Sequence, residues 1–93
     1  MGQEADLTAL TVSVSPNPTS TVGMVNVTVP QSGRVTVALY DAVGQLVSTI
    51  VDEEKTAGIY GFDMNAASLA QGRYIVKVTM NGTTATNSVS VVR

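Results

Sequence analysis

Few residues of this chain have side chains that could do chemistry. The sequence has no His and no Cys, so the commonest general base near neutral pH and the best single nucleophile are both missing. The remaining possibilities are a carboxylate pair, Asp41 with Asp63, or a serine activated by Lys55 or Lys77. Nothing in their spacing favours either arrangement, so we expect a protein that is not an enzyme.

Metal and cofactor sites are equally short of ligands. Without His or Cys, the usual ligands of zinc, haem and iron–sulfur clusters are lacking. Asp52, Glu53 and Glu54 offer carboxylate oxygens to a calcium ion, but consecutive carboxylates diverge and no Asp-x-Asp-x-Asp-Gly loop occurs. We therefore expect a solvated charged loop here, and no cofactor, metal ion or small-molecule substrate.

Aromatic side chains are a further candidate for ligand binding. The three tyrosines and one phenylalanine could form a stacking platform for a sugar ring. Tyr60 and Tyr74, however, each follow a glycine by two positions, where a strand begins. At such a position a ring can pack inward while its hydroxyl bonds to the backbone of a loop, so we expect structural roles for both.

Charge and hydropathy limit the class of partner. Charged residues make up 13% of the chain and the formal net charge is −2, so no basic field exists to attract a nucleic acid. The longest apolar stretches are far shorter than the roughly 20 residues that span a bilayer. We expect neither a nucleic-acid partner nor a membrane-spanning segment.

The length of 93 residues fits one domain. Residues 1–9 have the composition of a linker end or a cloning remnant, whereas residues 10–93 carry a regular pattern. We therefore expect a single domain over residues 10–93. Because Arg93 directly follows a strand pattern, we also expect it to be a natural chain end.

The elements that must position these residues are strands. Val and Thr are the most abundant residues, and both are stiff, β-branched side chains that suit a pleated surface. Alternation of apolar and polar residues, interrupted by Pro, Gly, Asn and Asp, predicts strands over residues 10–15, 24–29, 35–40, 45–51, 58–64, 74–80 and 88–92. The segment 66–70 has some helical propensity but is too short for more than one turn.

Local turn chemistry joins these strands. Asp41 to Gly44 has the composition of a type I turn closed by a left-handed glycine, and Asn81-Gly82 suits a type I′ hairpin turn, so we expect positive φ at Gly44 and Gly82. Asn17, between two prolines, should form a rigid, extended corner. The strand over 45–51 has apolar residues at both parities, which predicts that it is central and covered on both faces.

Seven short antiparallel strands at this spacing predict an all-β, immunoglobulin-like Greek-key sandwich, with a small closed barrel as the alternative. The Cys–Trp–Cys signature of antibody domains is missing, so the likeness to immunoglobulins is architectural. The residues expected to be mostly buried are Val25, Val27, Val35, Val37, Leu39, Leu46, Ile50, Tyr74, Val76 and Val78.

Four short segments occur together in a definite order: Ser15-Pro16-Asn17-Pro18, then Leu39-Tyr40-Asp41-Ala42-Val43-Gly44-Gln45-Leu46-Val47, then Ala57-Gly58-Ile59-Tyr60, then Leu69-Ala70-Gln71-Gly72-Arg73-Tyr74. In this order the chain, from about Leu10 to Arg93, resembles the type A C-terminal sorting domain of type IX secretion cargo, also called the Por secretion system sorting domain. The resemblance assigns structural or recognition roles to Pro16, Asn17, Pro18, Tyr40, Asp41, Gly44, Gly58, Tyr60, Leu69, Gly72, Tyr74, Val89, Val91 and Arg93.

The resemblance implies a transport function. Such a domain is recognised in the periplasm of a Gram-negative bacterium by the type IX translocon, and its cargo then crosses the outer membrane. A surface peptidase of sortase-like action commonly removes the domain and attaches the cargo to the cell surface, so the domain is a substrate and not a catalyst. The family tends to have a Lys near the start of its final segment, where this chain has Thr86-Asn87-Ser88. The competing hypothesis is a spacer, or a carbohydrate-binding or protein-binding module, of a secreted multidomain protein.

Overall fold

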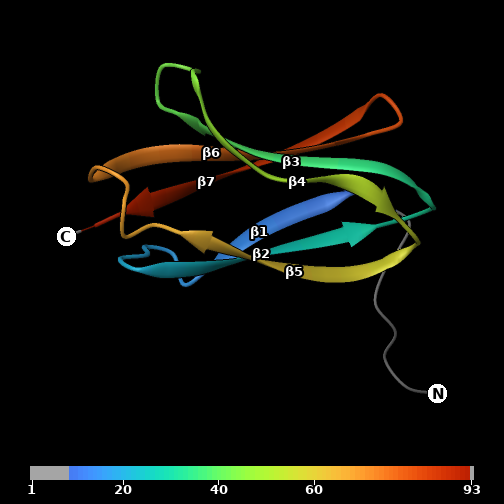
Figure 1. Ribbon diagram of the computed structural model, residues 1–93, viewed down its shortest axis with the longest axis horizontal. Helices are drawn as coiled ribbons and strands as arrows, with labels where there is room; N and C mark the ends of the chain where they lie inside the picture. Colours follow the sequence, from blue (N-terminus) through green and yellow to red (C-terminus); the bar gives the residue numbers. More distant parts are fainter. Residues whose placement is uncertain (1–8, 93) are drawn as a thin grey trace.

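Two antiparallel sheets pack face to face in the computed structural model, which describes residues 9–92 (Figure 1). Within this range the chain forms β1 (Thr11–Ser15), β2 (Val22–Val29), β3 (Gly33–Asp41), β4 (Leu46–Lys55), β5 (Gly58–Asn65), β6 (Gly72–Met80) and β7 (Thr83–Val91). One sheet has the order β1-β2-β5 and the other β4-β3-β6-β7, which confirms the predicted all-β sandwich. Over the same residues there is no helix long and apolar enough to cross a membrane.

The core lies between the inward faces of the two sheets, which are seen edge-on in Figure 1. Alternate residues of β2, β3 and β6 point into it, so most of the predicted core is confirmed, and the fully buried side chains include Val25, Val27, Val35, Val37, Leu39, Val76 and Val78. Two predicted core residues differ. Ile50 is half-buried, and Leu46 is 58% exposed.

The prediction that β4 is a central strand is wrong, because β4 forms an edge of the four-stranded sheet. Its pairing with β3 shifts register twice, so that Ile50 and Val47 are extra residues without a partner on β3. Each β-bulge changes which face the following residues occupy. Apolar residues therefore occur at both odd and even positions of β4 because each bulge reverses the in–out alternation of its side chains. They do not indicate that both faces of the strand are covered.

Strands β4 and β7 extend several residues further than the pattern predicts. The acidic run Asp52 to Glu54 belongs to β4 and is not a loop, because these residues pair in register with Arg34 to Thr36 of β3. Strand β7 begins at Thr83, where polar side chains hide the alternation. In both stretches the neighbouring strand supplies the main-chain hydrogen bonds, which the side-chain pattern does not reveal.

The turn predictions are confirmed. Gly44 has a φ of 89° and Gly82 a φ of 79°, and Asn81 is also left-handed at 51°. The Asp41 carboxylate holds the β3–β4 turn, since its Oδ1 accepts hydrogen bonds from the backbone N–H of Val43 at 3.1 Å and of Gln45 at 2.9 Å. Successive positive φ values at Asn81 and Gly82 fit a type I′ turn between β6 and β7.

Candidate functional site

The groups considered for catalysis are not assembled into a site within residues 9–92. Asp41 is at the end of β3 and Asp63 on β5, which belong to different sheets. The ammonium of Lys55 is 3.3 Å from Glu53 Oε1 and lies 5.2 Å from the centroid of the Tyr60 ring. Lys77 lies over the ring of Tyr40 on the outer face of the four-stranded sheet, 5.5 Å from its centroid. Each of these cations therefore has a structural neighbour and no paired serine.

The acidic run of β4 does not form a metal site. Asp52 Oδ1 accepts hydrogen bonds from Arg34 Nε at 2.9 Å and from Thr36 Oγ1 at 3.2 Å, and together they hold the pKa of the Asp52 carboxyl below its ordinary value. Glu53 pairs instead with Lys55. Neighbouring carboxylates of the run thus point to opposite faces of the strand, and no group of three His, Cys, Asp or Glu residues that could hold a metal ion occurs in the described part of the chain.

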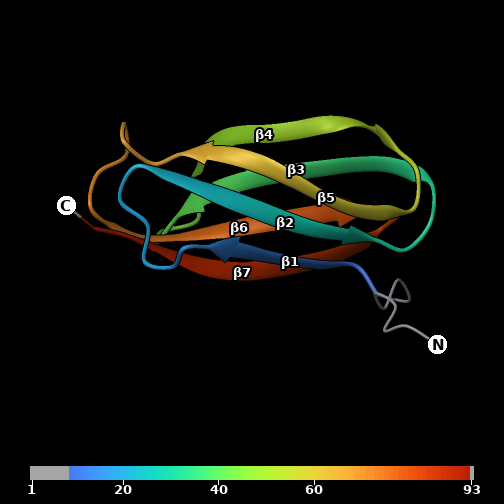
Figure 2. The same cartoon turned by 90° about the horizontal axis from the view of Figure 1, so that it is seen from below.

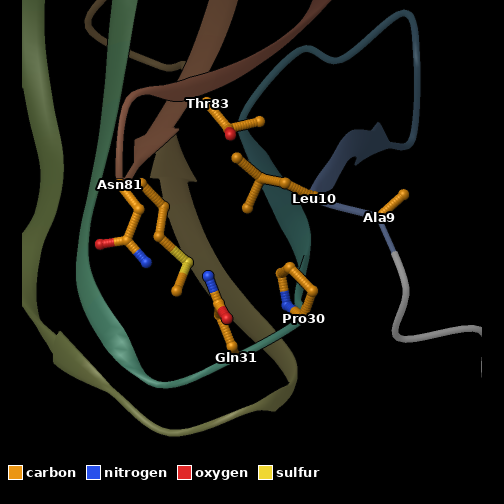
Figure 3. A pocket seen from close by; sticks show the side chains of 7 residues that line it. Ala9, Leu10, Pro30, Gln31, Asn81 and Thr83 are labelled. Carbon is orange, nitrogen blue, oxygen red and sulfur yellow. The ribbon is translucent and has the colours of Figure 1, made fainter.

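A hollow of about 710 Å³ lies at the end of the sandwich near the β6–β7 turn (Figure 3). Its lining consists of Ala9, Leu10, Pro30, Gln31, Met80, Asn81 and Thr83. None of these side chains is ionisable. Among the described residues, the hollow therefore offers no acid, base or charged anchor for a substrate.

Two of the tyrosines that the sequence singled out have the predicted structural role. The Tyr60 hydroxyl donates to the Thr56 carbonyl oxygen at 2.7 Å, and the Tyr74 hydroxyl donates to the Ala70 carbonyl oxygen at 2.6 Å. Each ring thus packs against the core while its hydroxyl fixes the loop four residues earlier. Gly58 and Gly72 are the first residues of the two strands that carry these rings.

Tyr40 and Leu69 occupy different positions. Tyr40 is half-buried on the outer face of the four-stranded sheet, with Leu46 beside it on one strand and Ile75 on the other, and Lys77 over its ring. Leu69 is half-buried and packs against the core from the turn before β6. These motif positions are therefore spread over the sandwich and do not form one cluster.

The segment with Pro16, Asn17 and Pro18 reaches the other end of the chain. The Asn17 side chain donates from Nδ2 to the Ser88 carbonyl oxygen at 3.1 Å and accepts at Oδ1 from the Ser90 backbone N–H at 3.0 Å. Its amide thus pairs with β7 as a backbone peptide group would. Both proline peptide bonds in this segment are cis.

Thr19 continues this contact through its own backbone. Its N–H donates to the Ser90 carbonyl oxygen at 2.8 Å, and its carbonyl oxygen accepts from the Val92 N–H at 2.9 Å, which gives a parallel bridge to Val91. We call Asn17 and Thr19 together the clamp. The Thr19 side chain is 1% exposed, and its hydroxyl has no hydrogen-bond partner.

The final strand is held along its other edge by β6, in an unbroken ladder from Gly72 with Val91 to Met80 with Thr83. Val89 and Val91 are buried in the core. The Asn87 side chain also donates from Nδ2 to a carbonyl oxygen of β1 at 3.0 Å. The last described strand is thus fixed through both edges and its inward side chains. Arg93, which the resemblance includes among the motif positions, lies outside the described residues.

The sequence did not predict the hydrogen bonds between Asn17 and β7. The sequence predicts a rigid corner at this position, but its partners are 71 and 73 residues away. The available signal was a polar amide between two prolines, where the side chain has no helix to cap and needs a partner elsewhere.

Fold and site together define an immunoglobulin-like β-sandwich module in which β7 is held by the clamp on one edge and by β6 on the other. A model of the secretion system C-terminal sorting domain family matches residues 13–92, and the chain belongs to this family. The family consists of sorting signals for type IX secretion, so this domain acts with the type IX machinery in export to the cell surface or beyond. No curated protein matches the chain.

Proposed function

We propose that the type IX translocon recognises this domain in the periplasm of a Gram-negative bacterium by the folded end of the sandwich that β7 and the clamp form. A surface peptidase of sortase-like action then removes the domain, which is the substrate of that step and not its catalyst. Of the motif positions, Asn17, Val89 and Val91 lie on or against β7 and contribute to recognition. The flanking Pro16 and Pro18, and Arg93, contribute with them.

The observation that carries this proposal is the fixed conformation of β7. Terminal strands tend to fray unless they are tied down, and a frayed strand presents no constant surface to a receptor. Here four hydrogen bonds from the clamp hold residues 88–92 on the edge opposite β6. A receptor can therefore read both the shape of this end and the folded state of the domain.

The remaining motif positions support the fold. Asp41 and Gly44 form the β3–β4 turn, and Tyr60 and Tyr74 tie loops to the core. The absence of an assembled acid–base pair within residues 9–92 supports a non-catalytic role, since a catalytic base must lie within hydrogen-bonding reach of the group it serves. The engagement of Lys55 with Tyr60 and Glu53 supports it further.

The test is a fusion of residues 10–93 behind a periplasm-targeted fluorescent protein, in a bacterium that has the type IX system. A second fusion lacks residues 89–93, and each purified domain is checked for folding by circular dichroism. We expect fluorescence at the surface or in the medium for the intact fusion alone. If the intact fusion folds normally but stays in the periplasm, the sorting proposal fails and a spacer or binding role replaces it.

A further inference from the structure

The two long sides of the sandwich differ in how they are closed (Figure 2). On one side, β1 lies beside β7, with Asn87 bonded to the carbonyl oxygen of Val12 and Thr19 bridged to Val91. On the other side β4 and β5 are edge strands of different sheets, and neither pairs with the other. This second side is therefore the open seam of the sandwich.

One half of the open seam is covered and the other is hollow. Near the β4–β5 turn, Lys55 lies over the rings of Tyr60 and Phe62, at 5.2 and 5.5 Å from their centroids. Toward the other end, a cleft of about 410 Å³ separates the two edges. We call this hollow the β4 cleft; its walls are residues 47–50 of β4 and residues 63–65 of β5.

The floor of the β4 cleft is apolar. Leu39 and Met64, which belong to the buried core, line it together with Leu69. Four consecutive residues of β4 contribute to one wall, so that wall comprises the edge of the strand and not one of its faces. An apolar side chain placed in the cleft would therefore contact the core, while its main chain lay along the edge of β4.

The adjoining edge of β4 lacks the usual protection. From Leu46 to Val51 it carries neither a charge nor a proline, and the exposed fractions of Leu46 and Val47 are 58% and 38%. The rest of the strand, Asp52 to Lys55, is fully charged. Edge strands avoid pairing through charges, prolines and bulges, and in the uncharged half only the two bulges are present.

The bulges also decide which occupant fits. Two copies paired edge to edge over Leu46 to Val51 would set one bulged stretch against another, so neither would offer a regular row of donors and acceptors. A short, flexible segment of another protein needs only a few main-chain bonds and one anchoring side chain. The charges favour a basic segment, because the Asp63 carboxylate on the rim of the cleft has no ion pair within residues 9–92.

We propose that the β4 cleft binds an extended segment of a partner protein, with an apolar side chain in the cleft, basic residues beside it and main-chain hydrogen bonds to β4. This surface is at the opposite edge of the sheet from β7, so the proposal does not depend on the sorting role.

The experiment titrates a capped synthetic hexapeptide, Lys-Thr-Val-Leu-Thr-Lys, into the isotopically labelled 93-residue chain and follows the amide resonances by NMR. We expect saturable shifts confined to residues 46–51 and 63–65, with a dissociation constant of about 1 mM or below. Replacing the peptide's Leu by Asp should abolish these shifts, and replacing its Lys residues by Glu should weaken binding at least tenfold.

Two matched variants of the protein complete the test. Val47→Lys places a positive charge at the wall of the cleft, where it repels a basic segment, and should weaken binding at least tenfold, whereas Val22→Lys changes another exposed valine, on the other sheet, and should leave binding unchanged. Equal binding to both variants, or no shifts at about 1 mM peptide, overturns the proposal. A concentration-dependent dimer that Val47→Lys abolishes also overturns it, because the occupant would then be a second copy.

Discussion

Asn17 links the two ends of the domain, so its removal should destabilise β7 more than its exposed position suggests. Asn17→Ala deletes one donor and one acceptor, which bond to the Ser88 carbonyl oxygen and the Ser90 N–H. A hydrogen bond contributes about 0.5–1.5 kcal/mol net, so we expect a loss of about 1–2 kcal/mol in the free energy of unfolding. For a domain of this size that corresponds to a fall of about 1 M in the urea midpoint.

Hydrogen exchange shows whether the lost stability is localised to β7. The Ser90 amide loses its acceptor, so its protection should fall more than that of amides in the β3–β6 ladder. Asn26→Ala is the control, because Asn26 is another asparagine on a sheet surface, with hydrogen bonds of only 3.4 Å. An unchanged urea midpoint together with unchanged protection at Ser90 would refute the clamp as a stabilising contact.

Three further predictions concern stability, each read from urea or thermal denaturation. Leu39→Ala should cost about 2–4 kcal/mol because Leu39 is fully buried, whereas Leu46→Ala should cost less than about 0.5 kcal/mol; equal losses would contradict the assigned edge position of β4. Thr19→Val replaces a buried hydroxyl that has no partner and keeps the backbone bonds of the clamp, so it should stabilise the domain by about 1 kcal/mol, and destabilisation would show that the hydroxyl is satisfied. Hydrogen bonds from Arg34 and Thr36 lower the pKa of Asp52 in the folded domain, so the ionised carboxylate stabilises the fold above about pH 4. This stabilisation is lost as the pH falls through the folded-state pKa. Asp52→Asn should therefore reduce the loss of stability between about pH 4 and lower pH, and an unchanged loss would contradict this prediction.

Local chemistry made most of the fold predictable. Alternation identified the strands because each buries one face, and the turns at Gly44 and Gly82 followed from residues that tolerate positive φ. The position of β4 was not predictable in this way. Its bulges change the alternation, so an edge strand has the same apolar pattern as a central one.

The candidate site was less accessible to sequence reasoning. The resemblance selected Asn17 as a motif position, but its hydrogen bonds to Ser88 and Ser90 depend on how β1 and β7 meet across the sandwich. The acidic run was predicted as a loop, because its pairing with β3 is a property of the neighbouring strand. The features that local patterns did not predict thus depend on contacts between segments that are distant in the sequence.

We propose that the type IX machinery recognises the folded end of the domain that β7 and the clamp form. The most direct measurement is the exported fraction of the fluorescent fusion carrying Asn17→Ala, beside the intact fusion and Asn26→Ala, at a temperature where all three domains are folded. We expect a several-fold lower exported fraction for Asn17→Ala and no change for Asn26→Ala. Equal export of all three, with the Ser90 amide exposed to exchange in the Asn17→Ala variant, would contradict the account.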